Sequence, residues 1–332
     1  MKTIAYVSLA EAGGVAVLAL DDATGALRPL QALSLDGQIM PLALAPHGRL
    51  LYAARRSEPH AVLALAIDPA DGRLSLLGET PLPASMPSLA LDGRGRWLLS
   101  ASYHDGLVAV NRIGADGRVL PTHQVLATGA RTHRLLPTPD NRHALACVLG
   151  EDLLLRLPFD AGRGRLGQPE SLALPAGSGP RHVVLHPRGD RAWVLGELDG
   201  SVSTVALDAA GLRLLDVASA LPPGFAGTPW AADLRWHPEG GHLVASERTG
   251  STLCLLAIDA LQDRLRPLGH WPTQAQPRGF AIAPGGRWLL CAGQRSHAGG
   301  VHRIDIGAGT LVPVSELPVG RDPNWIEVLS LP

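Results

Sequence analysis

The chain has 332 residues, more than the usual size of one domain, so either two domains or one large closed architecture is expected. Hydrophobic residues make up 46% of it, and its 38 Gly and 28 Pro suit a protein built from many short strands and turns. The formal net charge is −1 and the 29 basic residues are scattered without a block, which excludes the electrostatic signature of nucleic-acid or membrane-surface binding.

The N-terminal segment, residues 1–14, has a faint signal-peptide character, because Lys2 precedes an apolar run and an Ala-x-Ala pattern that ends at Ala12. Ser8 and Glu11 interrupt that run, and we therefore predict a β-strand that belongs to the mature fold. No stretch approaches the roughly 18 apolar residues of a membrane span, so no membrane partner is expected.

Six units of similar pattern follow one another from residue 41 onward. Each has a short apolar strand, a Pro, Asp or Gly turn, a second apolar strand and a polar segment. Each then continues into a third strand, such as residues 61–68 or 201–208, and a fourth, such as residues 72–79. The starts lie about 45 to 50 residues apart, the period of four-stranded propeller blades. The units start at Pro41, Pro87, Thr132, Pro180, Trp230 and Pro277.

The two chain ends supply one more blade. Residues 323–330 are typical of a first strand, whereas residues 3–8, 15–21 and 26–33 are typical of the second, third and fourth strands. Their pairing removes the exposed edges that an open array would leave. The predicted fold is therefore all-β: a seven-bladed β-propeller closed by pairing of the N- and C-terminal strands in one blade, with residues 1–332 as a single domain.

Three cysteines stand far apart at Cys147, Cys254 and Cys291, without the spacing of a zinc site. Their number is odd, and they fit reduced, buried thiols. We therefore expect a cytoplasmic protein without a bound metal.

One hairpin, residues 177–201, indicates where the function lies. Its two strands are separated by a turn-rich segment and run antiparallel. Arg181 and His182, at the start of the first strand, therefore lie at the same end as Glu197, which follows the second strand. A structural salt bridge would also explain this trio taken alone, but the unit recurs around the ring.

In every blade the corresponding end opens on one face, around the central channel. Guanidinium and imidazole groups with a few carboxylates favour a small anionic ligand there, whereas solvated loop ends would concentrate fewer such groups. The opposite face carries ordinary Gly, Asp and Asn turns. The positions on the first face are Arg56, His104, His133, Arg181, His182, Glu197, Trp230, Asp233, Glu247, Arg248, Arg278, Gln294, His297, Asn324 and Trp325.

Other motifs have structural interpretations. Gly162, Gly164 and Gly167 form a G-x-G-x-x-G string, but we predict a turn between strands with no βαβ unit and hence no dinucleotide. The Arg-Gly-Asp at residues 188–190 is predicted to be a hairpin turn. No G-x-S-x-G elbow appears. A non-catalytic binding module is the rival class, and the 4% aromatic content gives it little support.

Four stretches add a further signal. They are GPRHVVLHP with GELDGSV (179–187 and 196–202), WAADLRWHPEGGHL with ERTGS (230–243 and 247–251), TQAQPRGFAIAPGGRWLLCAGQRSH (273–297) and VGRDPNWIEV (319–328). In this order they resemble the lactonase family of seven-bladed propellers, and within it the bacterial 6-phosphogluconolactonase branch. The resemblance covers essentially the whole chain.

The resemblance implies hydrolysis of 6-phospho-D-glucono-1,5-lactone to 6-phosphogluconate in the pentose phosphate pathway. A related branch, the fungal carboxymuconate-lactonising enzymes, implies the alternative that the chain forms or opens another anionic lactone, of muconate type. In that branch a His, two Arg and a Glu are proposed for the site. The matching positions here are His133, Arg181, Arg278 and Glu197.

Three positions depart from the family pattern. Ser88 stands where a histidine is usual, Leu136 lies where an asparagine is expected after His133, and Leu153 follows Asp152 in place of an arginine. All three lie in the third and fourth blades. They therefore bear on the identity of the substrate more than on the chemistry.

Lactone hydrolysis needs a nucleophilic water, a base and positive charge beside the developing oxyanion. The expected base is Glu197, His182 or His133. One of Arg181 and Arg278 is expected to polarise the carbonyl, and the other to bind the anionic end of the substrate. No metal or cofactor is expected. The partner is a small anionic lactone, bound by a monomer or weak homodimer. The expected substrate contacts are Arg56, His104, Trp230, Asp233, Arg248, Gln294, His297 and Asn324.

Overall fold

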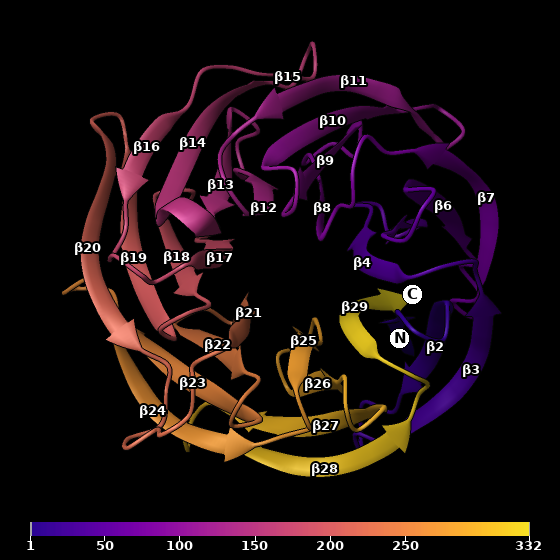
Figure 1. Ribbon diagram of the computed structural model, residues 1–332. Helices are drawn as coiled ribbons and strands as arrows, with labels where there is room; N and C mark the ends of the chain where they lie inside the picture. The colour runs from indigo at the N-terminus through magenta and orange to yellow at the C-terminus, as the bar shows by residue number, and fades with distance from the viewer. Residues whose placement is uncertain (1, 332) are drawn as a thin grey trace.

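Seven antiparallel sheets stand in a ring around a central axis in the computed structural model, which describes residues 2–331 (Figure 1). The predicted all-β, seven-bladed propeller is confirmed. The helical content of these residues is one 3-10 turn, η1 (Leu149–Glu151). No helix within residues 2–331 is long and apolar enough to cross a membrane.

The first blade is built from both ends of the chain, as predicted. Its C-terminal strand is innermost and pairs antiparallel with the N-terminal strand from Lys2↔Leu331 to Ser8↔Trp325. The closure predicted from the sequence is confirmed. From the channel outward, the blade consists of β29 (Pro323–Leu331), β1 (Lys2–Leu9), β2 (Gly14–Leu20) and β3 (Leu27–Ser34).

The other six blades follow in chain order, each beginning at the channel. Blade 2 has β4 (Ile39–Leu44), β5 (Leu50–Arg55), β6 (Ala61–Ile67) and β7 (Leu74–Pro81). Blade 3 has β8 (Ser88–Leu91), β9 (Trp97–Ser102), β10 (Leu107–Ile113) and β11 (Val119–Ala127). Blade 4 has β12 (Thr132–Pro137), β13 (His143–Val148) and β14 (Leu153–Asp160), with an outer strand broken into β15 (Arg165–Leu166) and β16 (Glu170–Ala173).

Blades 5 to 7 complete the ring. Blade 5 has β17 (Pro180–Leu185), β18 (Arg191–Gly196), β19 (Ser201–Asp208) and β20 (Gly211–Ser219). Blade 6 has β21 (Ala231–Trp236), β22 (His242–Glu247), β23 (Thr252–Asp259) and β24 (Arg264–Pro272). Blade 7 has β25 (Pro277–Ile282), β26 (Trp288–Gly293), β27 (Ala298–Asp305) and β28 (Thr310–Pro318).

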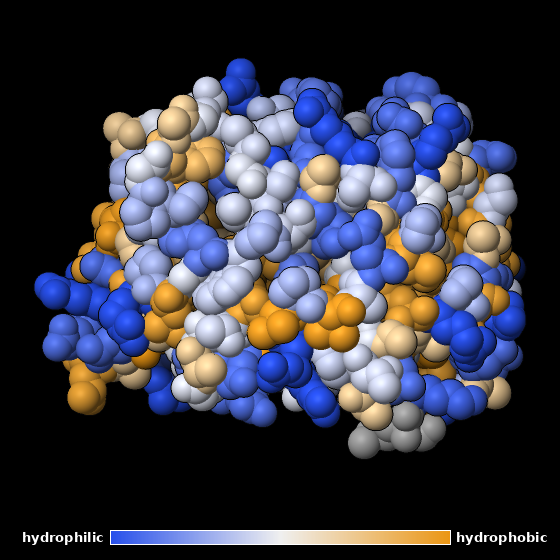
Figure 2. All heavy atoms as spheres, turned by 90° about the horizontal axis from the view of Figure 1, so that it is seen from below, coloured by the Kyte–Doolittle hydropathy of each residue, from blue (hydrophilic) through white to orange (hydrophobic). Residues whose placement is uncertain are grey.

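The core lies between neighbouring blades. Second strands such as β13 are buried on both faces because each blade packs against two others, so their sequences are almost continuously apolar. Outer strands such as β11 alternate between exposed and half-buried residues. Seen edge-on, the outer rim mixes hydrophobic groups with hydrophilic ones (Figure 2). Exposed apolar side chains on outer strands are Leu76, Leu120, Val125, Val217, Val312 and Val314.

The glycine string is a structural turn, as expected. Gly162 and Gly164 lie between β14 and β15, and Gly167 follows β15. Gly164 has φ +67°, and the ring of Trp97 packs where a Cβ atom would lie. Only glycine fits both conditions without strain.

We expect Gly164→Ala to lower the free energy of unfolding by about 2 kcal/mol, because left-handed strain adds to a clash with the Trp97 ring. Gly177→Ala is the matched control: its φ is +77°, but nothing lies within 4 Å of its Cβ position. That variant should lose only the backbone contribution, about 1 kcal/mol. Denaturant unfolding of both variants measures the difference, and equal losses would contradict the packing role of Trp97.

Candidate active site

A β-bulge lies near the channel-face end of the inner strand in six of the seven blades. His133, Arg181 and Arg278 each fall between two successive strand pairs and have no partner opposite them. A bulge re-aims the side chain of the unpaired residue. Three of the five residues predicted to be catalytic therefore occupy equivalent positions around one mouth of the channel.

The remaining bulges carry other side chains. Met40 and Pro41 are unpaired in blade 2, and Asn324 is unpaired in blade 1. Next to Arg278, Gly279 allows a close approach, since a Cβ atom there would meet the backbone of Asn324. The strands that carry Arg278 and Asn324 therefore lie side by side at the mouth.

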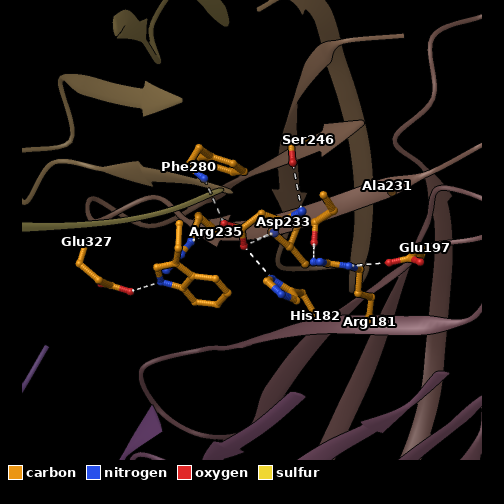
Figure 3. A network of polar contacts seen from close by, with 12 residues as sticks. Arg181, His182, Glu197, Ala231, Asp233, Arg235, Ser246, Phe280 and Glu327 are labelled. Carbon is orange, nitrogen blue, oxygen red and sulfur yellow. Dashed lines mark hydrogen bonds and ion pairs between the residues drawn. The ribbon is translucent and has the colours of Figure 1, made fainter. Parts of the chain in front are cut away.

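Glu197 is held between two buried arginines. Its Oε2 lies 2.6 Å from Nε of Arg181 and 2.9 Å from Nη2 of Arg248 (Figure 3 shows the first pair). Arg181 also donates to the carbonyl oxygen of Ala232. Burial raises the pKa of Glu197, but the charges of Arg181, Arg248 and Arg278 outweigh burial and hold the pKa below its usual value. The carboxylate is thus ionised and already occupied, which makes it a weak base.

Arg278 differs from these arginines. It is half-buried, and among residues 2–331 no ion pair or hydrogen bond engages its guanidinium. Burial and then repulsion from Arg181, Arg248 and Arg56 lower its pKa well below the usual value. Its donors are therefore available to an anionic ligand, which would also relieve the repulsion.

Arg56 completes the group at the mouth. Its Nε donates to Oγ of Ser85 at 3.0 Å, and its Nη1 lies 3.7 Å from Sδ of Met40. Burial and the charge of Arg181 lower its pKa. Four guanidinium groups thus surround one carboxylate, and the mouth carries a net positive charge that suits an anionic substrate.

The two histidines are both buried and lie close together. Their ring centroids are 5.4 Å apart, and Nδ1 of His133 and Nε2 of His182 are both buried without a hydrogen-bond partner. Burial, followed by the charge of Arg181, lowers the pKa of each well below its usual value. The charges of Arg278 and Arg56 also lower the pKa of His133. Both rings are neutral, and His133 is the one that lies among the arginines of the mouth.

His182 is fixed from below by Asp233. Nδ1 of His182 lies 2.7 Å from Oδ1 of Asp233, whose other oxygen lies 3.1 Å from Nε of Arg235 and accepts from the backbone N–H of Phe280 at 3.2 Å (Figure 3). Burial raises the pKa of Asp233, but Arg235 and His182 hold it below its usual value. Asp233 is 1% exposed, and both of its carboxylate oxygens are occupied by these partners, so its role is to hold His182 in place.

The other predicted substrate contacts are spread around the mouth. Trp230 is 38% exposed, and the guanidinium of Arg248 lies 3.8 Å from its ring centroid. Asn324 is buried and accepts from Ser8 at 3.1 Å. Gln294 donates to Asp322 at 2.7 Å.

Two predicted histidine contacts lie farther out. His104 and His297 lie in turns between second and third strands, as Arg56 and Glu197 do, but their side chains are exposed. The backbone N–H of Asp322 donates to Nδ1 of His297 at 3.2 Å. The structure brings together Arg56, His133, Arg181, Glu197, Arg248 and Arg278, and leaves these two histidines outside that group.

Structural roles are seen for Ser88, one of the positions that depart from the family pattern, and for Asp152, which precedes another of them. The carboxylate of Asp152 accepts from the backbone N–H groups of Gly177 and Gly179 at 2.7 and 2.8 Å. It thereby holds the loop that leads into β17 and Arg181. Ser88 is fully buried, and its Oγ lies 3.4 Å from the backbone nitrogen of Leu135.

Sequence reasoning overlooked Arg134, Arg235 and Glu327. They lie in the inner strands β12, β21 and β29, each of which also carries a predicted site residue. The signal for them was a charged residue in the middle of an apolar inner strand, where a purely structural strand carries Val, Leu or Ala. Arg134 follows His133 directly, and Arg235 lies two residues beyond Asp233.

Neither a metal cluster nor a disulfide occurs in the part of the chain that is described. No three His, Cys, Asp or Glu side chains among residues 2–331 are arranged to hold a metal ion. Cys147, Cys254 and Cys291 are free and buried, and burial raises the pKa of each thiol to about 12. The thiols are therefore protonated and unreactive.

Comparisons with known proteins agree with the fold. Residues 3–328 match the family model described as a lactonase, 7-bladed β-propeller. A protein from Pectobacterium carotovorum named 6-phosphogluconolactonase is 37% identical, with 100% of both chains covered, and its namesake from Pectobacterium atrosepticum is 38% identical at the same coverage. A solved structure, the periplasmic gluconolactonase of Pseudomonas aeruginosa, superposes with a TM-score of 0.92 at 26% identity over 100% of both chains.

Proposed function

The chain belongs to the lactonase family of seven-bladed β-propellers, and from that premise we propose that it hydrolyses 6-phospho-D-glucono-1,5-lactone to 6-phosphogluconate, a step of the pentose phosphate pathway. The observation that carries the proposal is the free guanidinium of Arg278 beside neutral His133 and ion-paired Arg181. Opening a phosphorylated lactone requires a group that polarises the carbonyl, a base that deprotonates water, and positive charge that binds the phosphate.

His133 is the base in this mechanism. It removes a proton from a water molecule whose oxygen forms a bond to the lactone carbonyl carbon. Arg278 stabilises the negative charge that develops on the carbonyl oxygen. When the tetrahedral intermediate collapses, the ring C–O bond breaks, and the protonated imidazole returns its proton to the leaving ring oxygen. Glu197 keeps Arg181 in place and takes no proton, because its pKa is lowered.

Arg56 holds the phosphate end. Ser85 orients its guanidinium through one bond at Nε, which leaves donors for a phosphate oxygen. Arg248 is fixed by Glu197, by the carbonyl oxygens of Trp230 and Ala231, and by the Trp230 ring, so it contributes charge from a fixed position. Because a phosphorylated lactone is charged and does not cross membranes, we assign the activity to the cytoplasm. The oligomeric state proposed is a monomer or weak homodimer.

A muconate-type lactone is the second candidate substrate. It is favoured by one observation: His133, Arg181, Glu197 and Arg278, the four positions that match the lactonising branch, are all at the same mouth. A dicarboxylate would place its second carboxylate where the phosphate end is expected.

The test is a pH-indicator or NMR assay of freshly generated phosphogluconolactone, with the spontaneous opening rate subtracted. Glucono-1,5-lactone and a muconolactone are the comparison substrates. We expect kcat/KM for the phosphorylated lactone to exceed that for gluconolactone by about tenfold or more, because charge-assisted hydrogen bonds contribute about 1.5–3 kcal/mol. A muconolactone turned over fastest would favour the second candidate, and no acceleration of any lactone would refute the catalytic assignment.

A further inference from the structure

A second pocket occupies the other end of the channel. It encloses about 480 Å³ and extends along the inner strands to the exposed turn residues Gly93 and Pro139, on the face opposite to the catalytic mouth. Its walls include Arg134, Arg235 and Glu327. The proposed lactone chemistry uses none of these three side chains.

Arg134 has no partner for two of its nitrogens. Nε and Nη1 are both enclosed by protein and lack any acceptor among the described residues. The guanidinium carbon lies 5.5 Å from the ring centroid of Trp325, so the group is stacked rather than ion-paired. Burial, followed by repulsion from Arg235, lowers its pKa to about 10. Among the charged neighbours of Arg134, the one with the largest effect on its pKa is therefore another cation, Arg235.

Arg235 is only partly satisfied. Its Nε is 3.1 Å from Asp233, but its Nη2 is enclosed without a partner in the described structure. Its guanidinium carbon also lies 5.5 Å from the centroid of the Trp325 ring. Both arginines thus approach one indole, and together they have three guanidinium nitrogens without a partner in the wall of the pocket.

The nearby carboxylates do not reach these donors. Asp233 already accepts from His182, Arg235 and two backbone N–H groups. Glu327 accepts from Nε1 of Trp325 at 2.8 Å, and burial raises its pKa despite the charge of Arg235. Buried donors in native proteins almost always have partners, so a group from outside the chain is required here.

We propose that this pocket binds a small oxyanion, of the size of inorganic phosphate, between Arg134 and Arg235. Arginine forks suit oxyanions because they donate several fixed N–H groups, and stacking on Trp325 holds the fork in place. The site is separate from the catalytic mouth. His182, the lining residue nearest that mouth along β17, lies with its ring between those of His133 and Trp325, at centroid distances of 5.4 and 5.7 Å.

The Trp325 indole is a built-in reporter, because its N–H is bonded to Glu327 inside the pocket wall. Inorganic phosphate is titrated into uniformly ¹⁵N-labelled protein, and the indole resonance is assigned with Trp325→Phe. We expect a saturable shift in the wild type. In Arg134→Met, which keeps an unbranched side chain but removes the guanidinium, the midpoint should rise about tenfold or more.

Two variants control for binding elsewhere. Arg278→Met removes the free guanidinium of the catalytic mouth, and Arg163→Met removes an arginine whose side chain is 83% exposed. Both should leave the midpoint of the Trp325 shift unchanged. A midpoint equal to wild type in Arg134→Met, no shift at all in the wild type, or a shift abolished by Arg278→Met would each overturn the proposal.

A second measurement covers the case in which Arg134→Met does not fold. Wild-type crystals soaked in selenate should show an anomalous peak within hydrogen-bonding distance of Arg134 and Arg235. Ordered water alone at that position would overturn the proposal. Neither experiment depends on lactone turnover, so its outcome is independent of the proposed activity.

Discussion

Arg278→Met will lower kcat/KM for 6-phosphogluconolactone by about 100-fold or more, as expected when a donor to a developing oxyanion is removed. The free energy of unfolding should stay the same or rise slightly, because the guanidinium has no partner in the described structure and is repelled by Arg56, Arg181 and Arg248. The assay with subtracted background and denaturant unfolding measure the two quantities on the same preparation.

Two further variants serve as comparisons for Arg278→Met. Arg181→Met should lower both turnover and stability, because Glu197 and the Ala232 carbonyl lose a buried partner. Arg94→Met, on an exposed turn of the opposite face, should change neither. Wild-type turnover in Arg278→Met would remove this residue from the chemistry.

His133→Ala is expected to lower kcat by about 100-fold or more, the usual contribution of a general base. In the wild type, the acid limb of kcat/KM should lie below pH 6.5, the ordinary pKa of histidine, because burial and the charges of Arg181, Arg278 and Arg56 lower the pKa of His133. The base acts when unprotonated. Activity is therefore retained at pH 6.5 and above, and is lost as the pH falls through the lowered pKa.

The substrate phosphate itself titrates near pH 6, so the profile must be repeated with unphosphorylated gluconolactone. If the acid limb of kcat/KM persists with gluconolactone, it reflects a titrating group of the protein and not the substrate phosphate. Asp233→Asn should leave this limb in place, because Asp233 contacts His182 and not His133. His47→Ala, in a turn of the opposite face, should have the wild-type rate. A wild-type rate in His133→Ala would transfer the role of base to His182 or Glu197.

The ring and its closure were predictable because both follow from repetition. The period of the units fixes the four-stranded blade, and the leftover strands at the chain ends fit only one position. The end of the strands that carries Arg181 and Glu197 was also predictable, since antiparallel pairing alone determines it. These features depend on local sequence and on topology.

The division of roles among the charged residues was not predictable. From the sequence, Glu197 was expected to be a candidate base and Asp233 a substrate contact. In the structure Asp233 is paired with His182 and Arg235, whereas Glu197 lies between two arginines. Which partner a buried charge finds depends on bulges that twist His133 and Arg278 toward the channel, and a bulge is visible only once both strands of a pair are known. The position of His104 was not predictable either, because its distance from the channel depends on the geometry of the turn in which it lies.

Closure of the ring also makes the channel depend on a long-range pairing. Asn324 and Trp325 reach the channel from β29, which pairs with β1, and Ser8 of β1 is 316 residues away from its partner Asn324 in the sequence. Contacts between strands so distant in sequence form slowly, whereas the other six blades are each built from consecutive strands. The channel therefore has all seven of its inner strands only after the least local contact of the fold has formed.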